Sequence, residues 1–348
     1  MEEAIKKTHS PDAFKRNTAH HAVDNIEHYS NKNYFQDVCS RIFHNPVAMV
    51  SLVIIVIIML FAIVAPITSP YTYKEVNTAQ SNLKPRIPGL EKLGILDGGT
   101  EVVVKPGGGV EVVKSYEYRG LDNVYHYFGT DNLGRDIWTR TAVGTRISLQ
   151  IAGVAVIIDI CIGVLFGLIS GYFGGMVDTI MQRIVEVLSG IPTLVVVTLL
   201  LMVLKPGLTS IIIAMVFTGW INMSRIVRAQ VLKLKGQEYV LASKTLGASS
   251  RDIIFKDLLP NTLGQIIVTF MFSIPNAIFT EAFLAFIGLG VPNPMASLGT
   301  LINDGYQSAM TYPYMIIMPV VVLGLLMLCF NLFADGLRDA IDPQMKQM

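Results

Sequence analysis

The sequence predicts an all-α membrane protein with six transmembrane helices, because it is too apolar for a water-soluble fold and its apolar residues form long runs. Hydrophobic residues make up 52% of the 348 residues and charged residues only 15%, and the mean hydropathy is +0.51. A helix needs about 20 apolar residues to cross the hydrocarbon core of a bilayer. We therefore expect lipid to solvate much of the chain.

The first apolar run, 47–67, contains no charged residue and predicts the first span. Pro192 in the third span and Pro275 in the fifth remove helical hydrogen bonds and are expected to kink their helices. The first 40 residues lack the apolar segment of a signal peptide, so the first span is expected to act as the insertion signal. The other five spans are predicted at 147–171, 180–204, 208–226, 262–288 and 313–335.

An even number of spans places both ends of the chain on one side of the membrane. Lys and Arg are concentrated in the N-terminal tail and in the loop after the fourth span, so these regions are expected in the cytoplasm. The resulting division is a cytoplasmic tail at 1–45, a first span at 46–68, an extracytoplasmic insert at 69–145, a helical core at 146–336 with a cytoplasmic loop at 228–260, and a cytoplasmic tail at 337–348.

The insert contains the alternating pattern of a β-hairpin. EVVV at 101–104 and VEVVKSYEY at 110–118 are rich in β-branched and aromatic residues, and the intervening Lys-Pro-Gly-Gly-Gly at 105–109 is typical of a turn. The insert is therefore expected to be partly β.

Composition and motifs exclude several classes of function. A net charge of +1 without a basic patch excludes a nucleic-acid partner. Cys39, Cys161 and Cys329 lack metal-ligand spacing and are expected to be free thiols, and His20-His21 in the polar tail is interpreted as solvated rather than as a metal site. No Gly-Lys dipeptide occurs, so the phosphate loop G-x-x-x-x-G-K-[ST] is absent, as are a nucleophile elbow and H-E-x-x-H. We predict no enzymatic activity and no metal or cofactor bound by this chain.

The second span carries glycine at every fourth position, namely Gly163, Gly167, Gly171 and Gly175. This spacing places the four on one helix face, where another backbone can approach closely. The face is interpreted either as ordinary small-residue packing or as a seam along which helices slide.

Two carboxylates, Asp159 and Glu281, lie inside the second and fifth spans. Charges at such depth are costly, so both are candidates for a transport pathway. The alternative is a carboxylate satisfied by a neighbouring hydroxyl, backbone group or subunit. Ahead of the second span, Asp131 and Arg135 are four apart, which predicts a salt-bridged helix start rather than a substrate site.

The loop after the fourth span, KGQEYVLASKTLGASSRDIIFKDLLPN at 235–261, is too apolar for a plain linker. Residues 238–246 predict a short helix that ends at Gly247. Ser249, followed three residues later by an aspartate, has the spacing of a capping box, and Pro260 marks the entry to the fifth span. Two short helices joined by a sharp turn are therefore expected on the cytoplasmic surface, with apolar side chains available for a partner.

This loop resembles the cytoplasmic signature of ABC importer permeases, in which two small residues precede a glycine and a Leu-Pro pair follows. Those positions hold Ala242-Ser243, Gly247 and Leu259-Pro260. The general pattern has a glutamate where this chain has Leu241 and an aliphatic residue where it has Asp257. The fuller run EYVLASKTLGAS resembles the variant found in peptide permeases.

Two further stretches carry the same resemblance. FGTDNLGRDIWTR at 128–140 and EAFLAFIGLGVPNP at 281–294 resemble segments of the second, C-type permease subunit of oligopeptide, dipeptide and nickel importers. The resemblance implies a type I importer core of five helices, spans two to six, preceded by an extra N-terminal span.

The resemblance also implies a function. The chain would form half of the translocation pathway of an oligopeptide importer in a bacterial cell membrane, together with a homologous second permease subunit. Two cytoplasmic ABC ATPase subunits would bind ATP and Mg and supply the hydrolysis, and an extracytoplasmic binding protein would deliver the peptide. The residues expected to couple to the ATPase are Glu238, Tyr239, Val240, Leu241, Ala242, Ser243, Gly247, Ala248 and Pro260.

Two alternative functions remain open. A permease for nickel or another small solute shares the three motifs. An ion-driven secondary transporter would use Asp159 or Glu281, but has little use for a docking loop.

Overall fold

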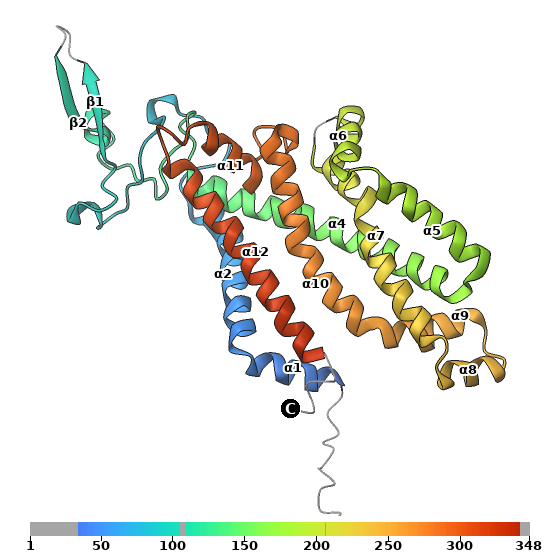
Figure 1. The fold of residues 1–348 in the computed structure, drawn as a ribbon. Coiled ribbons are helices and arrows are strands. Elements are labelled where there is room, and N and C mark those ends of the chain that lie inside the picture. The colour runs from blue at the N-terminus through green and yellow to red at the C-terminus, as the bar shows by residue number, and fades with distance from the viewer. Residues whose placement is uncertain (1–33, 105–108, 206, 342–348) are drawn as a thin grey trace, which may run out of the picture.

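The computed structural model describes residues 34–104, 109–205 and 207–341, and helices make up most of it. Long helices lie side by side, and a small β-hairpin projects from one end of them (Figure 1). We call the end that carries the hairpin the insert end, and the end that carries α1 (Tyr34–His44) and α8 (Glu238–Thr245) the far end.

Five helices of the described chain are long and apolar enough to cross a membrane: α2 (Pro46–Thr68), α4 (Ile137–Phe173), α7 (Leu208–Leu234), the continuous helix Ser250–Leu289 and α12 (Tyr314–Ile341). The continuous helix consists of α9 (Ser250–Asp252), a π-helical turn (Ile253–Leu258), α10 (Leu259–Leu284) and a second π-helical turn (Ala285–Leu289). The predicted all-α membrane fold is thereby confirmed.

The third predicted span is broken into two helices. α5 (Gly175–Gly190) and α6 (Thr193–Leu204) meet at an angle of 83°. Pro192 stands at the break, where its missing N–H prevents α5 from continuing. Pro192 was expected to kink one helix, and in the structure it instead separates two helices.

The insert forms the predicted hairpin. β1 (Thr100–Val104) pairs antiparallel with β2 (Val110–Lys114). The second strand is shorter than predicted, because Ser115–Tyr118 forms the helical turn α3. This turn carries Tyr116 into the insert, where its ring is 2% exposed and its hydroxyl donates to the Lys84 carbonyl at 2.9 Å. Among the described residues between α2 and α4, 3-10 turns are also present at Thr78–Gln80 and Glu91–Leu93.

The long helix α4 is the centre of the bundle, in contact with α2, α7, α10 and α11 (Leu298–Gln307). Its glycine face lies on α7: a Cβ atom at Gly163, Gly167 or Gly171 would lie 2.7, 2.6 or 2.8 Å from atoms of α7. The prediction that Gly175 belongs to this face is wrong. α4 ends at Phe173 and the chain turns, so a Cβ at Gly175 would meet no atom within 4 Å.

Replacing Gly167 with leucine should lower the unfolding temperature of the protein in detergent, because the added Cβ would lie 2.6 Å from the Ser224 carbonyl oxygen. Overpacking of this kind costs about 1–3 kcal/mol. Gly153→Leu in the same helix is the matched control, since a Cβ there meets no atom within 4 Å. Equal unfolding temperatures for the two variants would refute close packing along this face.

Candidate functional site

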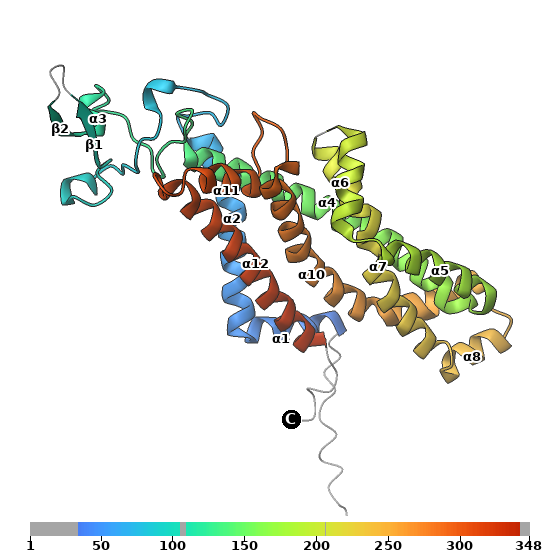
Figure 2. The same cartoon turned by 45° about the horizontal axis from the view of Figure 1, so that its top comes forward.

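The loop after α7 forms the predicted helix, turn and helix at the far end of the bundle, where α8 lies next to the end of α7 (Figure 2). Gly247 adopts a φ of 84°, a left-handed conformation that glycine reaches without strain. The Ser249 hydroxyl accepts the backbone N–H of Asp252 at 3.1 Å, as a helix cap does. In a full capping box the Asp252 carboxylate would accept the backbone N–H of Ser249. Here it accepts the Ser249 hydroxyl instead.

The helix that begins at Ser250 continues into the fifth span without a break. Pro260 lies in the first turn of α10, directly after the π-helical turn Ile253–Leu258. A proline inside a regular α-helix would clash with the carbonyl four residues earlier, and a wider turn relieves that clash. Pro260 therefore marks the start of α10 but does not separate it from the loop.

One residue of α8 holds the helix against the bundle. Val240 is 3% exposed and packs with Ile253 and Leu258 of the π-helical turn. It therefore faces inward and is not available to a partner, unlike its neighbours. Among the other eight loop residues singled out in the sequence, Ser243 and Ala248 are half-buried, and the exposed ones are Glu238, Tyr239, Leu241, Ala242, Gly247 and Pro260.

The outward side of α8 is an exposed apolar surface. Tyr239 is 41% exposed, Leu241 50% and Leu246 88%. Large apolar side chains grouped in this way commonly mark a protein interface. We call these three residues the α8 surface.

An ion pair that the sequence did not reveal fixes the helices beside α8. Arg228 of α7 donates through Nε and Nη2 to both oxygens of Asp178 in α5, each at 2.6 Å. Ser170 of α4 bonds the same carboxylate, and the Lys235 ammonium donates to the Gly171 carbonyl at 2.9 Å. The sequence showed charged residues near the ends of both spans, with nothing to single out Asp178 and Arg228 among them. Fifty residues separate them, so nothing local paired them.

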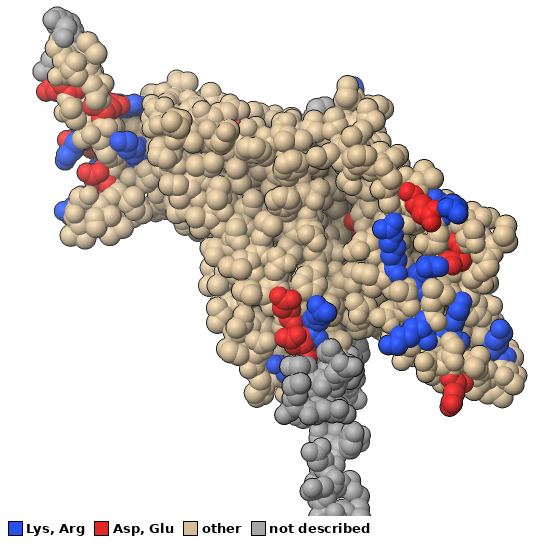
Figure 3. Space-filling view, in the orientation of Figure 1, with Lys and Arg blue, Asp and Glu red and all other residues tan. Residues whose placement is uncertain are grey.

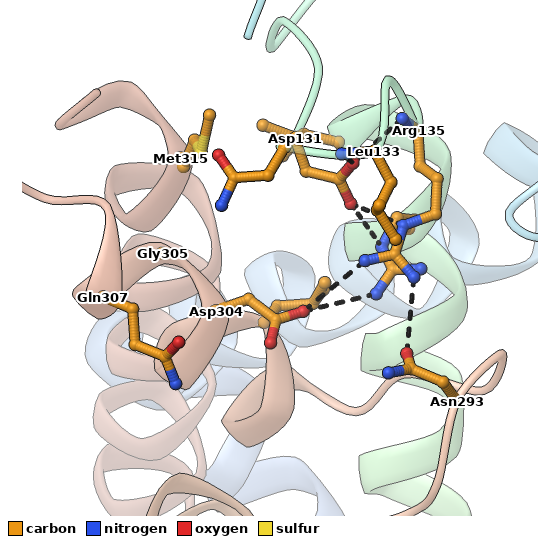
Figure 4. Close-up of a pocket in the computed structure, with 12 residues that line it drawn as sticks. Asp131, Leu133, Arg135, Asn293, Asp304, Gly305, Gln307 and Met315 are labelled. Atoms are coloured by element: carbon orange, nitrogen blue, oxygen red, sulfur yellow. Dashed lines mark hydrogen bonds and ion pairs between the residues drawn. The ribbon is translucent and has the colours of Figure 1, made fainter. Parts of the chain in front are cut away.

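A second polar cluster lies at the insert end, where a cavity of about 210 Å³ is lined by residues of the loop before α4 and of α11. Asp131 and Arg135 form the predicted ion pair, with 2.6 Å between Oδ2 and Nε (Figure 4). They do so in a loop rather than at a helix start, because Asp131 Oδ1 also accepts the backbone N–H groups of Leu133 and Arg135. Asp304 of α11 lies 3.7 Å from Arg135 and 3.6 Å from the buried Arg140.

The two carboxylates inside the spans lie in different surroundings. Glu281 is fully buried, and its Oε2 accepts the Ser148 hydroxyl at 2.7 Å, while Ser148 accepts the backbone N–H of Leu298 at 3.1 Å. Glu281 thus connects α10 with α4 and α11. Asp159 is half-buried against α7, where a Cβ at Gly219 would lie 2.0 Å from its Oδ2. No hydrogen bond joins Asp159 to Glu281, and within the described residues no cluster of His, Cys, Asp and Glu suits a metal ion.

Removing the carboxylate of the α5–α7 ion pair by Asp178→Ala should lower the free energy of unfolding by about 1 kcal/mol, because Arg228 loses a two-point, charge-assisted partner. The matched control on α5 is Glu186→Ala, which breaks an exposed pair with Arg183 and should leave stability unchanged. Thermal unfolding of the three proteins in detergent measures the difference. A control variant as unstable as Asp178→Ala would contradict the role of this pair.

Two segments of the chain match known families. Residues 163–347 match the family "Binding-protein-dependent transport system inner membrane component", and residues 33–85 match "N-terminal TM domain of oligopeptide transport permease C". The sequence-derived resemblance is thereby confirmed.

Two relatives and one solved structure illustrate the similarity. The "Oligopeptide transport system permease protein OppC" of Bacillus subtilis (strain 168) is 44% identical over 313 residues, 90% of each chain. The "Dipeptide transport system permease protein DppC" of Lactococcus lactis subsp. cremoris (strain MG1363) is 45% identical over 318 residues, 90% of this chain and 91% of the relative. A chain of the MetNI methionine ABC transporter aligns with 58% of this chain and 96% of its own, at 20% identity and a TM-score of 0.48.

The relatives align over nine tenths of the chain, and the first family match alone covers more than half of it. The chain therefore belongs to the inner-membrane permease components of binding-protein-dependent transport systems, among the C-type permeases of oligopeptide and dipeptide transport.

Proposed function

We propose that this chain is one of two homologous permease subunits of an ATP-driven oligopeptide importer. The names of its relatives supply the substrate class. The observation that carries the coupling role is the α8 surface, which is exposed and belongs to a helix packed through Val240 on the continuous helix that contains α10.

The proposal includes an orientation in the membrane. Lys and Arg gather on the far end around α5, α7 and α8 (Figure 3), as the positive-inside rule requires of a cytoplasmic face. The far end and both tails would then face the cytoplasm, and the insert would face outward toward a peptide-binding protein. ATP and Mg would be bound by two cytoplasmic ATPase subunits, and this chain would bind no cofactor.

The connection from α8 to the membrane suggests how ATP drives transport. Closure of the ATPase pair would displace the α8 surface, and the packing of Val240 on Ile253 and Leu258 would carry that displacement into the helix that contains α10. The Asp178–Arg228 pair and the close contact of α4 with α7 would make α5 and α7 move together. The far ends of the spans would then shift as a group and alternate the access of the pathway.

The carboxylates inside the spans are assigned separate roles in this proposal. Glu281, being enclosed, would hold α10 and α11 to α4 while the far end moves. Asp159, being only half-buried, stays a candidate for the pathway wall.

A charge placed on the α8 surface should separate the permease from its ATPase. Leu246→Glu should reduce co-purification of the ATPase subunits and abolish uptake of defined peptides, with the fold intact because this side chain is 88% exposed. Met310→Glu is the control, since Met310 is 100% exposed at the insert end and should tolerate the charge. Both are expressed in a bacterial strain that lacks the native chain. Normal ATPase binding and uptake with Leu246→Glu would rule out this docking surface.

A further inference from the structure

A row of uncharged polar side chains follows one face of α10. Gln265, Thr269, Ser273 and Asn276 recur at intervals of three or four residues, which aligns them along the helix. Together with Asn222 of α7, Arg338 of α12 and the apolar side chains of Ile226, Val268 and Phe272, they line a hollow of about 250 Å³. We call this hollow the amide groove. The three helices that form it lie in front of α4 in Figure 1.

Several polar groups of the amide groove have no partner among the residues that the structure describes. Asn222 and Gln265 are exposed, and neither side chain forms a hydrogen bond with any described residue. Asn276 is also exposed; its Nδ2 donates to the Phe272 carbonyl at 3.1 Å, and its Oδ1 stays free. Thr269 and Ser273 donate to carbonyls of their own helix and keep free lone pairs. The groove therefore offers unused donors and acceptors.

Such groups cannot face lipid without cost. An amide moved from water into an apolar medium without a hydrogen bond loses about 2–7 kcal/mol, and polar side chains in spans accordingly face protein or a water-filled cavity. The row lies inside the helix Ser250–Leu289, which is long and apolar enough to span the membrane. The amide groove is therefore expected to face water, a hydrogen-bonding ligand or another protein chain, and not lipid.

The chemistry of the lining matches a peptide main chain. Each peptide unit presents an N–H donor and a C=O acceptor whatever its side chain, and each Asn or Gln side chain presents both complements. Arg338 is the one charged residue of the lining, and neither Asp159 nor Glu281 belongs to it. Apart from Arg338 the lining is uncharged, so most of it does not select among peptides by side-chain charge.

We propose that the amide groove binds the main chain of the peptide in transit, so that peptides of different sequence are accepted alike. The inference rests on the proposed function as a peptide permease. It assigns the contact with substrate to Asn222, Gln265 and Asn276 and not to the carboxylates buried within the spans.

The test uses the complete transporter in proteoliposomes: this chain, the second permease, the ATPase subunits and the binding protein. The double variant Asn222→Leu, Asn276→Leu removes two amides at similar volume. Asn331→Leu on α12 is the matched control, because its amide, like that of Asn276, donates to a carbonyl four residues earlier but lies outside the groove. Uptake of tri-alanine, tri-lysine and tri-glutamate is measured with each protein.

The double variant should assemble normally and lose about thirtyfold in uptake, since two hydrogen bonds of roughly 1 kcal/mol each are lost. The loss should be the same factor for all three peptides, and smaller for tri-alanine N-methylated on its main chain. Asn331→Leu should equal the wild type, and Asn276→Gln should retain most of the uptake.

Other results would overturn the inference. Wild-type uptake by the double variant, or a loss that depends on peptide charge, would exclude main-chain binding in the groove. A double variant that no longer pairs with the second permease would make the groove a subunit interface instead. If the wild-type transporter moves no peptide, the proposed function fails at that first measurement, before any variant is compared, and the inference fails with it.

Discussion

The close contact between α4 and α7 is the constraint on which the remaining structure depends. Three glycines let the two backbones meet where any side chain would hold them apart. Apolar side chains alone cannot drive helices together in lipid, because lipid tails are equally apolar, so backbone proximity and packing must supply the attraction. With this pair fixed, α10 packs on α4, and the Asp178–Arg228 pair brings α5 against α7.

Charged groups occupy the two ends of the bundle, and their pairing differs between them. At the insert end, Asp131, Arg135, Arg140 and Asp304 neutralise one another around a small cavity, which links the loop before α4 to α11. At the far end, the Asp178–Arg228 pair is partly buried and many basic side chains stay exposed. The ion pairs that link one element to another therefore lie mainly at the insert end, which is proposed to face outward. The far end, where the ATPase subunits are proposed to bind, has fewer such links and is freer to move.

Sequence patterns predicted what depends on local rules. Apolar runs located the spans, alternation located the hairpin, and a glycine after a short helical segment located the turn after α8. What they missed depends on contacts distant along the chain. The bidentate partner of Arg228 is 50 residues away, Val240 faces inward only because Ile253 folds back on it, and Gly175 leaves the glycine face because α4 ends two residues earlier. The polar residues of α10 are visible in the sequence, but only the structure shows that α7 and α12 complete a groove beside them.

The bend at Pro192 has a consequence for the surrounding lipid. α6 has 12 residues, so at 1.5 Å per residue it extends only about 18 Å, far less than the roughly 30 Å of a hydrocarbon core. Because α5 leaves it at 83°, neither helix matches the bilayer alone. Where lipid and not a partner chain surrounds this pair, the membrane thins or deforms beside it, which places an elastic load on the protein. The length of the lipid acyl chains therefore affects the equilibrium between the conformations of the protein.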